Sequence, residues 1–186
     1  MSTLTILPSV ETPNLVVREM ALRDAKALAG FMTQQRYQRY TALRLRSEAE
    51  VSAFVARTVA RQGDERRNVF HLTAEERSSA EAIGDGFMIC QKDHVIEVGW
   101  GVHPAMWSMG IGKEIGQVLL GLAFERLHAK RVWCKVMTVN KPSTKLAAAI
   151  GMLHEKTVGG YAVGDGRIEN LSIYALDQAA YFDRSY

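Results

Sequence analysis

The chain has 186 residues, of which 47% are apolar, and its formal net charge is +3, from 23 basic and 20 acidic residues. At this length a single domain buries a substantial core, and a second domain is not expected. The nearly balanced charge argues against binding to nucleic acid or to a membrane surface, both of which favour strongly basic proteins.

Taken in chain order, the first half of the sequence predicts four strands and two helices. The strands are expected at 15–19, 69–73, 83–91 and 95–102, and the helices near 21–32 and 48–62. Ser47 and Glu50 have the spacing of a capping box, which marks the start of the second helix. Gly84 and Gly86 interrupt the third strand and indicate a β-bulge there.

The segment from His103 to Gly116, HPAMWSMGIGKEIG, carries the strongest functional signal. It follows a predicted strand, and an amphipathic helix pattern begins directly after Gly110. Unpaired N–H groups at the positive end of such a helix bind phosphate, and glycines let the backbone approach the anion closely. A Gly-x-Gly pair also occurs in plain turns, so the prediction depends on the strand before it and the helix after it. Lys113 is either a partner of the bound anion or a solvated surface lysine.

The second half of the chain continues with a helix at 111–127, a strand at 131–138 and a capped helix. Asn140 is the predicted N-cap of this last helix, Pro142 suits its first turn, and Gly151 suits its end. Strands at 154–163 and 168–176 then form a closing hairpin around 164–166.

Three segments resemble the acetyl-CoA-binding core of the GNAT N-acetyltransferases: Pro104-x-x-Trp107-x-x-Gly110-x-Gly112-Lys113-Glu114, Asn140-x-x-Ser143 and Ile150-Gly151-Met152. They are most similar to the branch that contains the bacterial ribosomal-protein N-terminal (alanine/serine) acetyltransferases. The N-terminal Thr12-x-x-Leu15-x-x-Arg18 resembles the opening strand of that branch, and 164–174 resembles its last hairpin. The resemblance extends from about residue 11 to about residue 176.

This resemblance implies a single-domain α/β (α+β) GNAT fold over residues 1–186. Its central sheet is mixed, mainly antiparallel and of about seven strands, with helices on both faces and a splayed strand pair at the acetyl-CoA site. Three positions depart from the branch. Ser108 and Met109 replace its usual Gly-Lys, which removes one phosphate partner and predicts weaker cofactor binding, and Met152 replaces its usual Phe.

The resemblance also assigns roles to individual residues. The backbone of Trp100, Gly101 and Val102 is expected to hold the pantetheine arm and the thioester oxygen. The remaining cofactor-binding residues that it implies are Trp107, Ser108, Met109, Gly110, Ile111, Gly112, Lys113, Asn140 and Ser143.

Three side chains are expected to take part in catalysis or acceptor binding. Glu97 is the expected general base, directly or through water, or else an exposed glutamate on a half-solvated strand. Ser143 is placed to hydrogen-bond the leaving thiolate, or else serves only as a polar helix-cap residue. Tyr161 lines the mouth of the acceptor site, or else is buried in the hairpin. The five histidines lack the spacing of metal ligands, so no metal is expected, and His103 is interpreted as a loop residue.

The acceptor is expected to be a protein or peptide N-terminal α-amine. An α-amine with a pKa near 8 is about 10% neutral at pH 7, so its deprotonation costs about 1.4 kcal/mol, against about 4.6 kcal/mol for lysine. Neither cysteine is placed to act as a nucleophile, so direct attack in a ternary complex is expected. The alternatives are acetylation of a small-molecule amine (aminoglycoside, polyamine or amino acid) and a non-catalytic acyl-CoA-binding protein.

Both cysteines, Cys90 and Cys134, lie within predicted strands, so a disulfide framework is not expected and a reducing compartment is favoured. The first ten residues lack the features of a secretion signal, and no window is apolar over the length of a membrane span. We therefore expect a cytoplasmic protein. Many relatives dimerise through their C-terminal strands, so a monomer and a homodimer both stay open.

Overall fold

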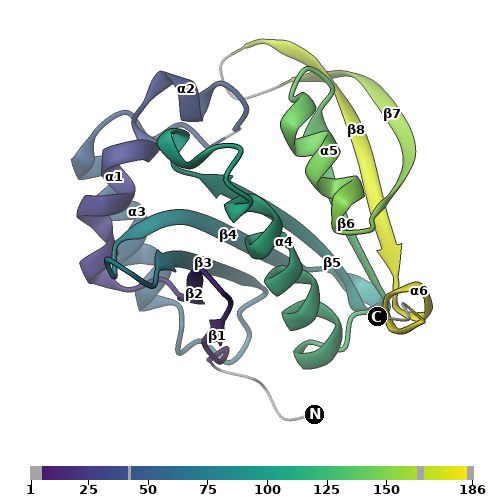
Figure 1. The fold of residues 1–186 in the computed structure, drawn as a ribbon, viewed down its shortest axis with the longest axis horizontal. Coiled ribbons are helices and arrows are strands. Elements are labelled where there is room, and N and C mark those ends of the chain that lie inside the picture. The colour runs from purple at the N-terminus through teal and green to yellow at the C-terminus, as the bar shows by residue number, and fades with distance from the viewer. Residues whose placement is uncertain (1–5, 42, 163–165, 184–186) are drawn as a thin grey trace.

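The computed structural model describes residues 6–41, 43–162 and 166–183, which form an eight-stranded sheet with helices on both faces (Figure 1). The strand order is β1-β2-β3-β4-β5-β6-β8-β7. The strands are β1 (Val10–Glu11), β2 (Leu15–Glu19), β3 (Val69–Glu76), β4 (Ala82–Cys90), β5 (Val95–Val102), β6 (Arg131–Met137), β7 (Leu153–Ala162) and β8 (Ile168–Asp177). The helices are α1 (Ala25–Met32), α2 (Gln35–Gln38), α3 (Glu48–Ala60), α4 (Ile111–Gly121), α5 (Lys141–Ala149) and α6 (Gln178–Phe182).

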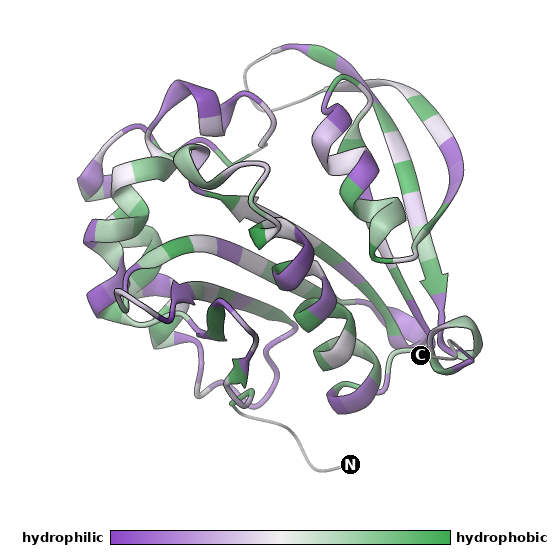
Figure 2. Ribbon diagram, in the orientation of Figure 1, coloured by the Kyte–Doolittle hydropathy of each residue, from purple (hydrophilic) through white to green (hydrophobic). Residues whose placement is uncertain are grey.

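The predicted fold, a mixed and mainly antiparallel sheet flanked by helices, is confirmed, but the sheet has eight strands and not about seven. The additional strand is β1, whose two residues are too few for an alternating pattern. Helix α2 also escaped prediction because it is short and almost entirely hydrophilic (Figure 2). The helix expected at 111–127 is α4 followed by a π-helical turn at Leu122–Arg126. The tip of the predicted closing hairpin, at 163–165, lies outside the described residues.

The two faces of the sheet are covered by different helices. Helices α4 and α5 lie on one face, whereas α1 and α3 cover the other (Figure 1). Helix α4 contacts β4 so closely that a Cβ added at Gly84 would lie 2.8 Å from the Cδ1 atom of Ile115. The predicted bulge is confirmed beside this glycine, because Ala74 pairs with Gly84 while Glu75 pairs with Ala82, which leaves Ile83 as the extra residue. A Cβ added at Gly84 or Gly86 would contact Ile115 or Leu119 of α4, so these positions lie on the α4 face and Asp85, between them, points to the opposite face.

Strands β5 and β6 pair in parallel over only three positions, the last of which joins Glu97 to Trp133. Beyond that point β5 continues beside β4 as far as Val102, while β6 continues beside β8 as far as Met137. The sheet therefore opens into a fork between β5 and β6, and the predicted splayed strand pair is confirmed.

The predicted helix caps are present. The Ser47 Oγ atom accepts a hydrogen bond from the Glu50 N–H at 3.2 Å, and the Glu50 carboxylate accepts one from the Arg46 N–H at 2.6 Å. At the start of α5, the Asn140 Oδ1 atom accepts a hydrogen bond from the Ser143 N–H at 3.3 Å. Gly151 follows the end of α5 with a φ of +87°, a left-handed conformation that favours glycine.

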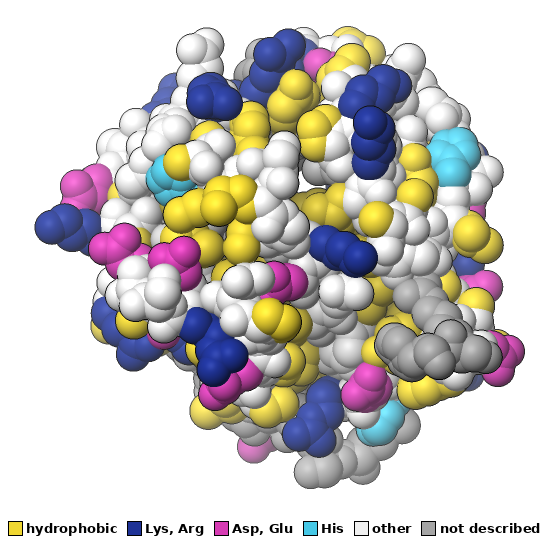
Figure 3. All heavy atoms as spheres, viewed as in Figure 1, with side chains coloured by type: hydrophobic (Ala, Val, Ile, Leu, Met, Phe, Trp, Pro, Cys, Tyr) yellow, Lys and Arg dark blue, Asp and Glu magenta, His cyan; other side chains and the backbone are white. Residues whose placement is uncertain are grey.

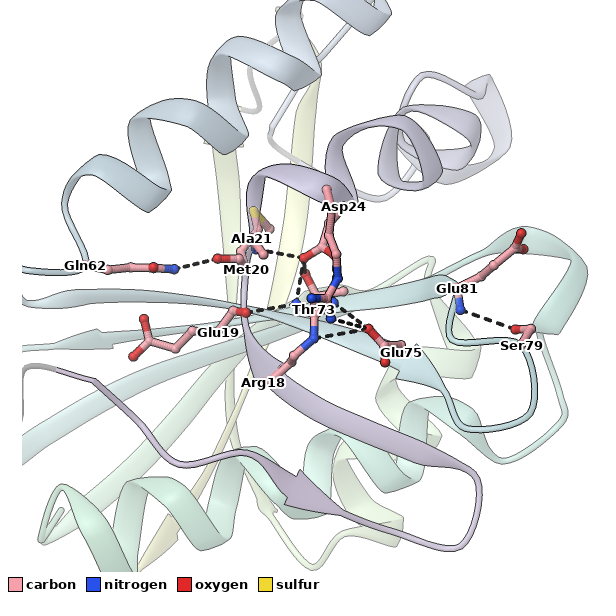
Figure 4. A network of polar contacts seen from close by, with 11 residues as sticks. Arg18, Glu19, Met20, Ala21, Asp24, Gln62, Thr73, Glu75, Ser79 and Glu81 are labelled. Carbon is pink, nitrogen blue, oxygen red and sulfur yellow. Dashed lines mark hydrogen bonds and ion pairs between the residues drawn. The ribbon is translucent and has the colours of Figure 1, made fainter.

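A buried ion-pair network ties β2, β3 and the start of α1 together (Figure 4). The Arg18 guanidinium donates to both oxygens of Asp24, at 2.7 and 2.9 Å, and also to Glu75. The second Asp24 oxygen accepts hydrogen bonds from the Ala21 N–H and the Thr73 hydroxyl, each at 2.8 Å. Burial works to raise the pKa of Asp24, but these donors hold it below its usual value. The network joins residues far apart in sequence, so no local pattern predicts it.

Candidate functional site

The loop after β5 folds back onto the end of its own strand. The Trp107 indole N–H donates to the Val102 carbonyl at 2.9 Å, and the Arg36 guanidinium lies 5.1 Å from the centre of the indole ring. His103 Nδ1 accepts a hydrogen bond from the Ala105 N–H at 3.0 Å, which agrees with its interpretation as a loop residue. Trp107 therefore holds the loop against the open end of the fork.

The predicted strand–turn–helix is present at the start of α4. Gly110 is the N-cap residue, with a φ of +84°, and no atom lies within 4 Å of the position that a Cβ would take there. Ser108 also has a positive φ, +66°. In the first turn of a helix the N–H groups have no intrahelical acceptor, so those of Ile111 and Gly112 face the open space before the helix. This geometry, with the helix dipole, suits a phosphate group.

The open edge of β5 presents backbone groups to the fork. The His103 N–H donates to the Ile83 carbonyl at 2.8 Å, so in this antiparallel pair His103 and Gly101 direct their backbone groups toward β4. By the alternation of the strand, the N–H and C=O groups of Trp100 and Val102 point toward β6, which has separated from β5 by this point. The Val102 carbonyl is already bonded to Trp107, whereas the Trp100 groups and the Val102 N–H face the fork.

Helix α5 lies beside the first turns of α4. A Cβ added at Gly112 would lie against Leu146, and one at Gly116 would lie 2.9 Å from the Cδ1 atom of Ile150. Ser143 is one turn before Leu146 and is partly exposed, and its hydroxyl makes no hydrogen bond within the described part of the chain.

Basic side chains border this face. In Figure 3 the surface is hollowed between the start of α4 and α5, and Lys and Arg side chains gather along its upper edge, over α2 and α5. Helix α2 contains Arg36, and α5 contains Lys141 and Lys145. Met109, in the loop, and Lys113, in the first turn of α4, are both exposed.

Glu97 lies at the last paired position before the fork and is only 6% exposed, so its interpretation as an exposed strand residue is wrong. Its carboxylate pairs with the Lys135 ammonium at 3.1 Å. The same ammonium lies 5.7 Å from the centre of the Tyr161 ring. Tyr161 is 40% exposed, so its burial in the hairpin is also wrong. Burial works to lower the pKa of Lys135, but the bond to Glu97 raises it above its usual value.

Sequence reasoning missed a second carboxylate on this face. Asp85 lies opposite Gly101 in the β4–β5 register, and the Tyr37 hydroxyl donates to its Oδ1 atom at 2.5 Å. A Cβ added at Gly101 would overlap both the Tyr37 hydroxyl and the Asp85 carboxylate. Burial raises the pKa of Asp85 to about 6, although the bond from Tyr37 opposes the shift. The available signal was a charged residue between two glycines inside an otherwise apolar strand.

The cysteines do not take part in this arrangement. Cys90 and Cys134 are free thiols, and burial raises the pKa of Cys134 to about 12, which suppresses the nucleophilic thiolate at neutral pH. Within the described ranges, no three His, Cys, Asp or Glu side chains are grouped so that they could hold a metal ion. None of the helices described is long and apolar enough to cross a bilayer.

Comparison with known proteins agrees with this geometry. The family model of the acetyltransferase (GNAT) domain matches residues 14–153. The uncharacterized N-acetyltransferase YoaA of Bacillus subtilis (strain 168) is 25% identical over 173 residues, which cover 92% of this chain and 97% of YoaA.

Two solved structures show the same fold at low identity. The ribosomal-protein-S5-alanine acetyltransferase from Vibrio fischeri superposes with a TM-score of 0.79 at 18% identity, covering 92% of this chain and 97% of that one. A spermidine N-acetyltransferase chimera from Vibrio cholerae and hSSAT superposes with a TM-score of 0.76 at 15% identity, covering 91% of this chain and 99% of that one. The family model spans most of the chain, and the fork and helix turn lie within that span. The chain therefore belongs to the GNAT family of N-acetyltransferases.

Proposed function

We propose that this N-acetyltransferase moves the acetyl group of acetyl-CoA to the α-amine at the N-terminus of a protein or peptide, by direct attack in a ternary complex. The observation that carries the proposal is the continuity of two features. The fork between β5 and β6 ends at Val102, and the phosphate-type turn at the start of α4 follows within ten residues. One extended ligand with a phosphate end and an amide-bearing arm fits this path.

The residues present fit acetyl-CoA. The N–H groups of the loop from Ser108 to Gly112, with the charge of Lys113, would hold the pyrophosphate. The Trp100 groups and the Val102 N–H, which β6 leaves unpaired, would bond the pantetheine amides and the thioester oxygen. Asn140 and Ser143 would border the same ligand from the start of α5. Because the phosphate contacts are made by backbone, the Ser108 and Met109 departures from the branch weaken this site without removing it.

Acetyl-CoA supplies an acetyl group on a thioester that an amine can attack directly. Backbone N–H groups aimed at the developing oxyanion are each worth about 3 to 4 kcal/mol. The Ser143 hydroxyl, which is not bonded to the protein within the described residues, is free to hydrogen-bond the departing thiolate. The resemblance to the family assigns the role of general base, acting directly or through water, to Glu97. Its carboxylate is paired with the Lys135 ammonium.

Two considerations support an α-amine acceptor. Its deprotonation costs about 3 kcal/mol less than that of a lysine side chain, which suits a site of modest basicity. The ribosomal-protein-S5-alanine acetyltransferase shares the fold over almost its whole length. The spermidine enzyme shares it as well, so small amines belong in the same test.

The first experiment is a calorimetric titration of acetyl-CoA into the wild-type protein, Gly110→Asp and Gly110→Asn. Asn tolerates a positive φ and carries no charge, so this pair isolates the effect of a negative charge at the phosphate turn. We expect micromolar binding by the wild type, similar binding by Gly110→Asn, and none by Gly110→Asp. Binding by Gly110→Asp at the wild-type level would contradict the phosphate turn.

The acceptor is then identified by CoA release with a panel of amines. The panel contains a lysine-free peptide with an N-terminal alanine, an N-blocked peptide with one lysine, spermidine and an aminoglycoside. We expect the alanyl peptide to be acetylated fastest. Faster acetylation of spermidine or the aminoglycoside would replace the proposed acceptor by a small-molecule amine, and binding without turnover of any amine would support a non-catalytic protein.

A further inference from the structure

We propose that Asp85, positioned by Tyr37, is the group that binds the ammonium of the acceptor and takes its proton before the amine attacks. The inference rests on the proposed function for the position of the thioester along Trp100 to Val102. It assigns ammonium binding and proton acceptance to a residue on β4, the strand next to the one that holds the cofactor, in place of Glu97.

The position of the carboxylate supports this role. Asp85 lies directly opposite Gly101, the central residue of the three whose backbone is expected to hold the thioester. Its side chain points to the sheet face away from α4, because Gly84 and Gly86 on either side of it lie under Ile115 and Leu119. An acceptor bound there would approach from the face of the sheet opposite α4. By contrast, Glu97 is four residues from Gly101, which corresponds to about 13 Å along a strand.

The charge balance around Asp85 also indicates a missing cation. In the described part of the chain, the two fully buried acidic residues, Asp24 and Glu97, are paired with Arg18 and Lys135, respectively. Asp85 is bonded only to the Tyr37 hydroxyl among the residues that the structure describes. Buried carboxylates are normally paired with a cation, and a substrate ammonium would supply one here. Asp85 and Tyr37 are each partly exposed, so a ligand can reach them.

The other polar and titratable groups on the strands beside Asp85 are engaged elsewhere. His71 on β3 contacts the rings of Phe54 and Phe87, and His103 caps the loop after β5. On the other side of Asp85, Thr73 donates its hydroxyl proton to Asp24, which is held by Arg18. None of these groups is hydrogen-bonded to Asp85 within the described ranges.

The proton balance is complete without a further reactant. The ammonium gives one proton to the Asp85 carboxylate and becomes a neutral amine. The amine nitrogen forms a bond to the thioester carbonyl carbon, the C–S bond breaks, and the thiolate takes the second proton that the nitrogen releases. The protonated Asp85 then returns its proton to solvent. A carboxyl with a pKa near 6, raised by burial, suits proton acceptance near neutral pH.

The test measures kcat/KM for acetyl-CoA and the alanyl peptide from pH 5 to 9, for the wild type, Asp85→Asn and Tyr37→Phe. Asp93→Asn in an exposed turn is the matched control. With Asp85 as base, the wild-type profile rises through the Asp85 pKa, about 6. The kcat/KM of Asp85→Asn should be about 100-fold or more below that of the wild type. Its profile should instead rise through about pH 8, where the peptide amine itself deprotonates. Tyr37→Phe should move the wild-type rise to higher pH, because it removes a bond that lowers the pKa of Asp85.

Calorimetry with acetyl-CoA accompanies each variant and should show an unchanged Kd, which shows that the fold and the cofactor site are intact. A rate for Asp85→Asn within about three-fold of wild type would overturn this inference and leave the proposed function standing. A large loss of kcat/KM in Asp85→Asn, with the pH profile still rising at the wild-type pH, would also overturn this inference, because it indicates a structural role for Asp85. A wild type that binds acetyl-CoA but acetylates no amine of the panel would overturn the proposed function, and this inference with it.

Discussion

At the scale of single residues, the carboxylates of this protein fall into two groups. Asp24 sits in a network of donors that hold its pKa below its usual value, so its charge stabilises the fold. Asp85 has a hydroxyl partner and no cation among the described residues, and burial raises its pKa to about 6. A carboxylate without a cation, like Asp85, lowers the free energy of unfolding at neutral pH. This is common where a residue serves binding or catalysis.

This difference predicts that Asp85→Asn is more stable than the wild type at neutral pH. A carboxyl whose pKa is raised on folding contributes stability below its unfolded pKa, about 3.8, and loses it as the pH rises through about 6. At pH 7.5 the variant should gain up to about 3 kcal/mol in the free energy of unfolding, from about 1.4 kcal/mol per pKa unit. Urea unfolding at pH 7.5 and pH 4 checks this, and the gain should disappear at pH 4. An equal or less stable variant at pH 7.5 would contradict the presence of a partly buried carboxylate without a cation.

At the scale of elements, the position of α4 depends on glycines in the strand beneath it. Gly84 has no room for a side chain between Ile115 of α4 and the Gly101 carbonyl of β5. From the other end, Glu114 in the first turn of α4 accepts hydrogen bonds from the Asn14 side chain and backbone, and from Thr12. Partial burial works to raise the pKa of Glu114, but these bonds hold it below its usual value. The phosphate turn is therefore fixed from the sheet and from the β1–β2 connection.

Gly84→Ala tests this close approach. Its Cβ would lie 2.9 Å from the Gly101 carbonyl oxygen, a backbone atom that cannot move without shifting β5. We expect a loss of about 1 to 3 kcal/mol in the free energy of unfolding, together with weaker acetyl-CoA binding. The matched control is Gly30→Ala on the exposed side of α1, where nothing lies within 4 Å, and it should gain about 0.4 to 1 kcal/mol. Chemical unfolding measures the free energy of unfolding of both variants. Equal changes for Gly84→Ala and Gly30→Ala would contradict the close approach of α4 to β4 at Gly84.

At the scale of the whole molecule, the sheet consists of two parts joined by the short parallel contact between β5 and β6. Strands β1 to β5 lie on one side of the fork, and β6, β8 and β7 lie on the other (Figure 1). A ligand bound in the fork would contact both parts, through β5 and the start of α4 on one side and the start of α5 on the other.

Acetyl-CoA should therefore stabilise the whole chain. At a concentration about 100 times its Kd, a ligand that binds only the folded state adds about 2.7 kcal/mol. For a protein of this size that corresponds to a rise in Tm of about 5 to 10 °C. Thermal unfolding with and without acetyl-CoA measures the shift, and hydrogen exchange should show added protection in β5, the loop before α4, and the start of α5. Protection confined to other elements would contradict binding in the fork.

The local features of the fold and of the site could be predicted from the sequence. The turn at Gly110, the caps at Ser47 and Asn140, and the terminator at Gly151 each depend on residues within a few positions of one another. The environment of Glu97 could not be predicted, because the ammonium beside it comes from the neighbouring strand β6. Tyr37 was missed because α2 has neither the length nor the apolar periodicity of a detectable helix.

The sequence by itself determined the order of the longer strands and helices, the glycine turn that opens α4, and the resemblance that the family model confirms. These follow from short-range steric and hydrogen-bonding preferences that each segment carries with it. Only the tertiary structure decided which carboxylate is paired and which is not. Arg18 meets Asp24 and Lys135 meets Glu97, whereas Asp85 meets Tyr37. The pKa of a side chain depends on burial and on charges that the fold brings to it from distant parts of the chain.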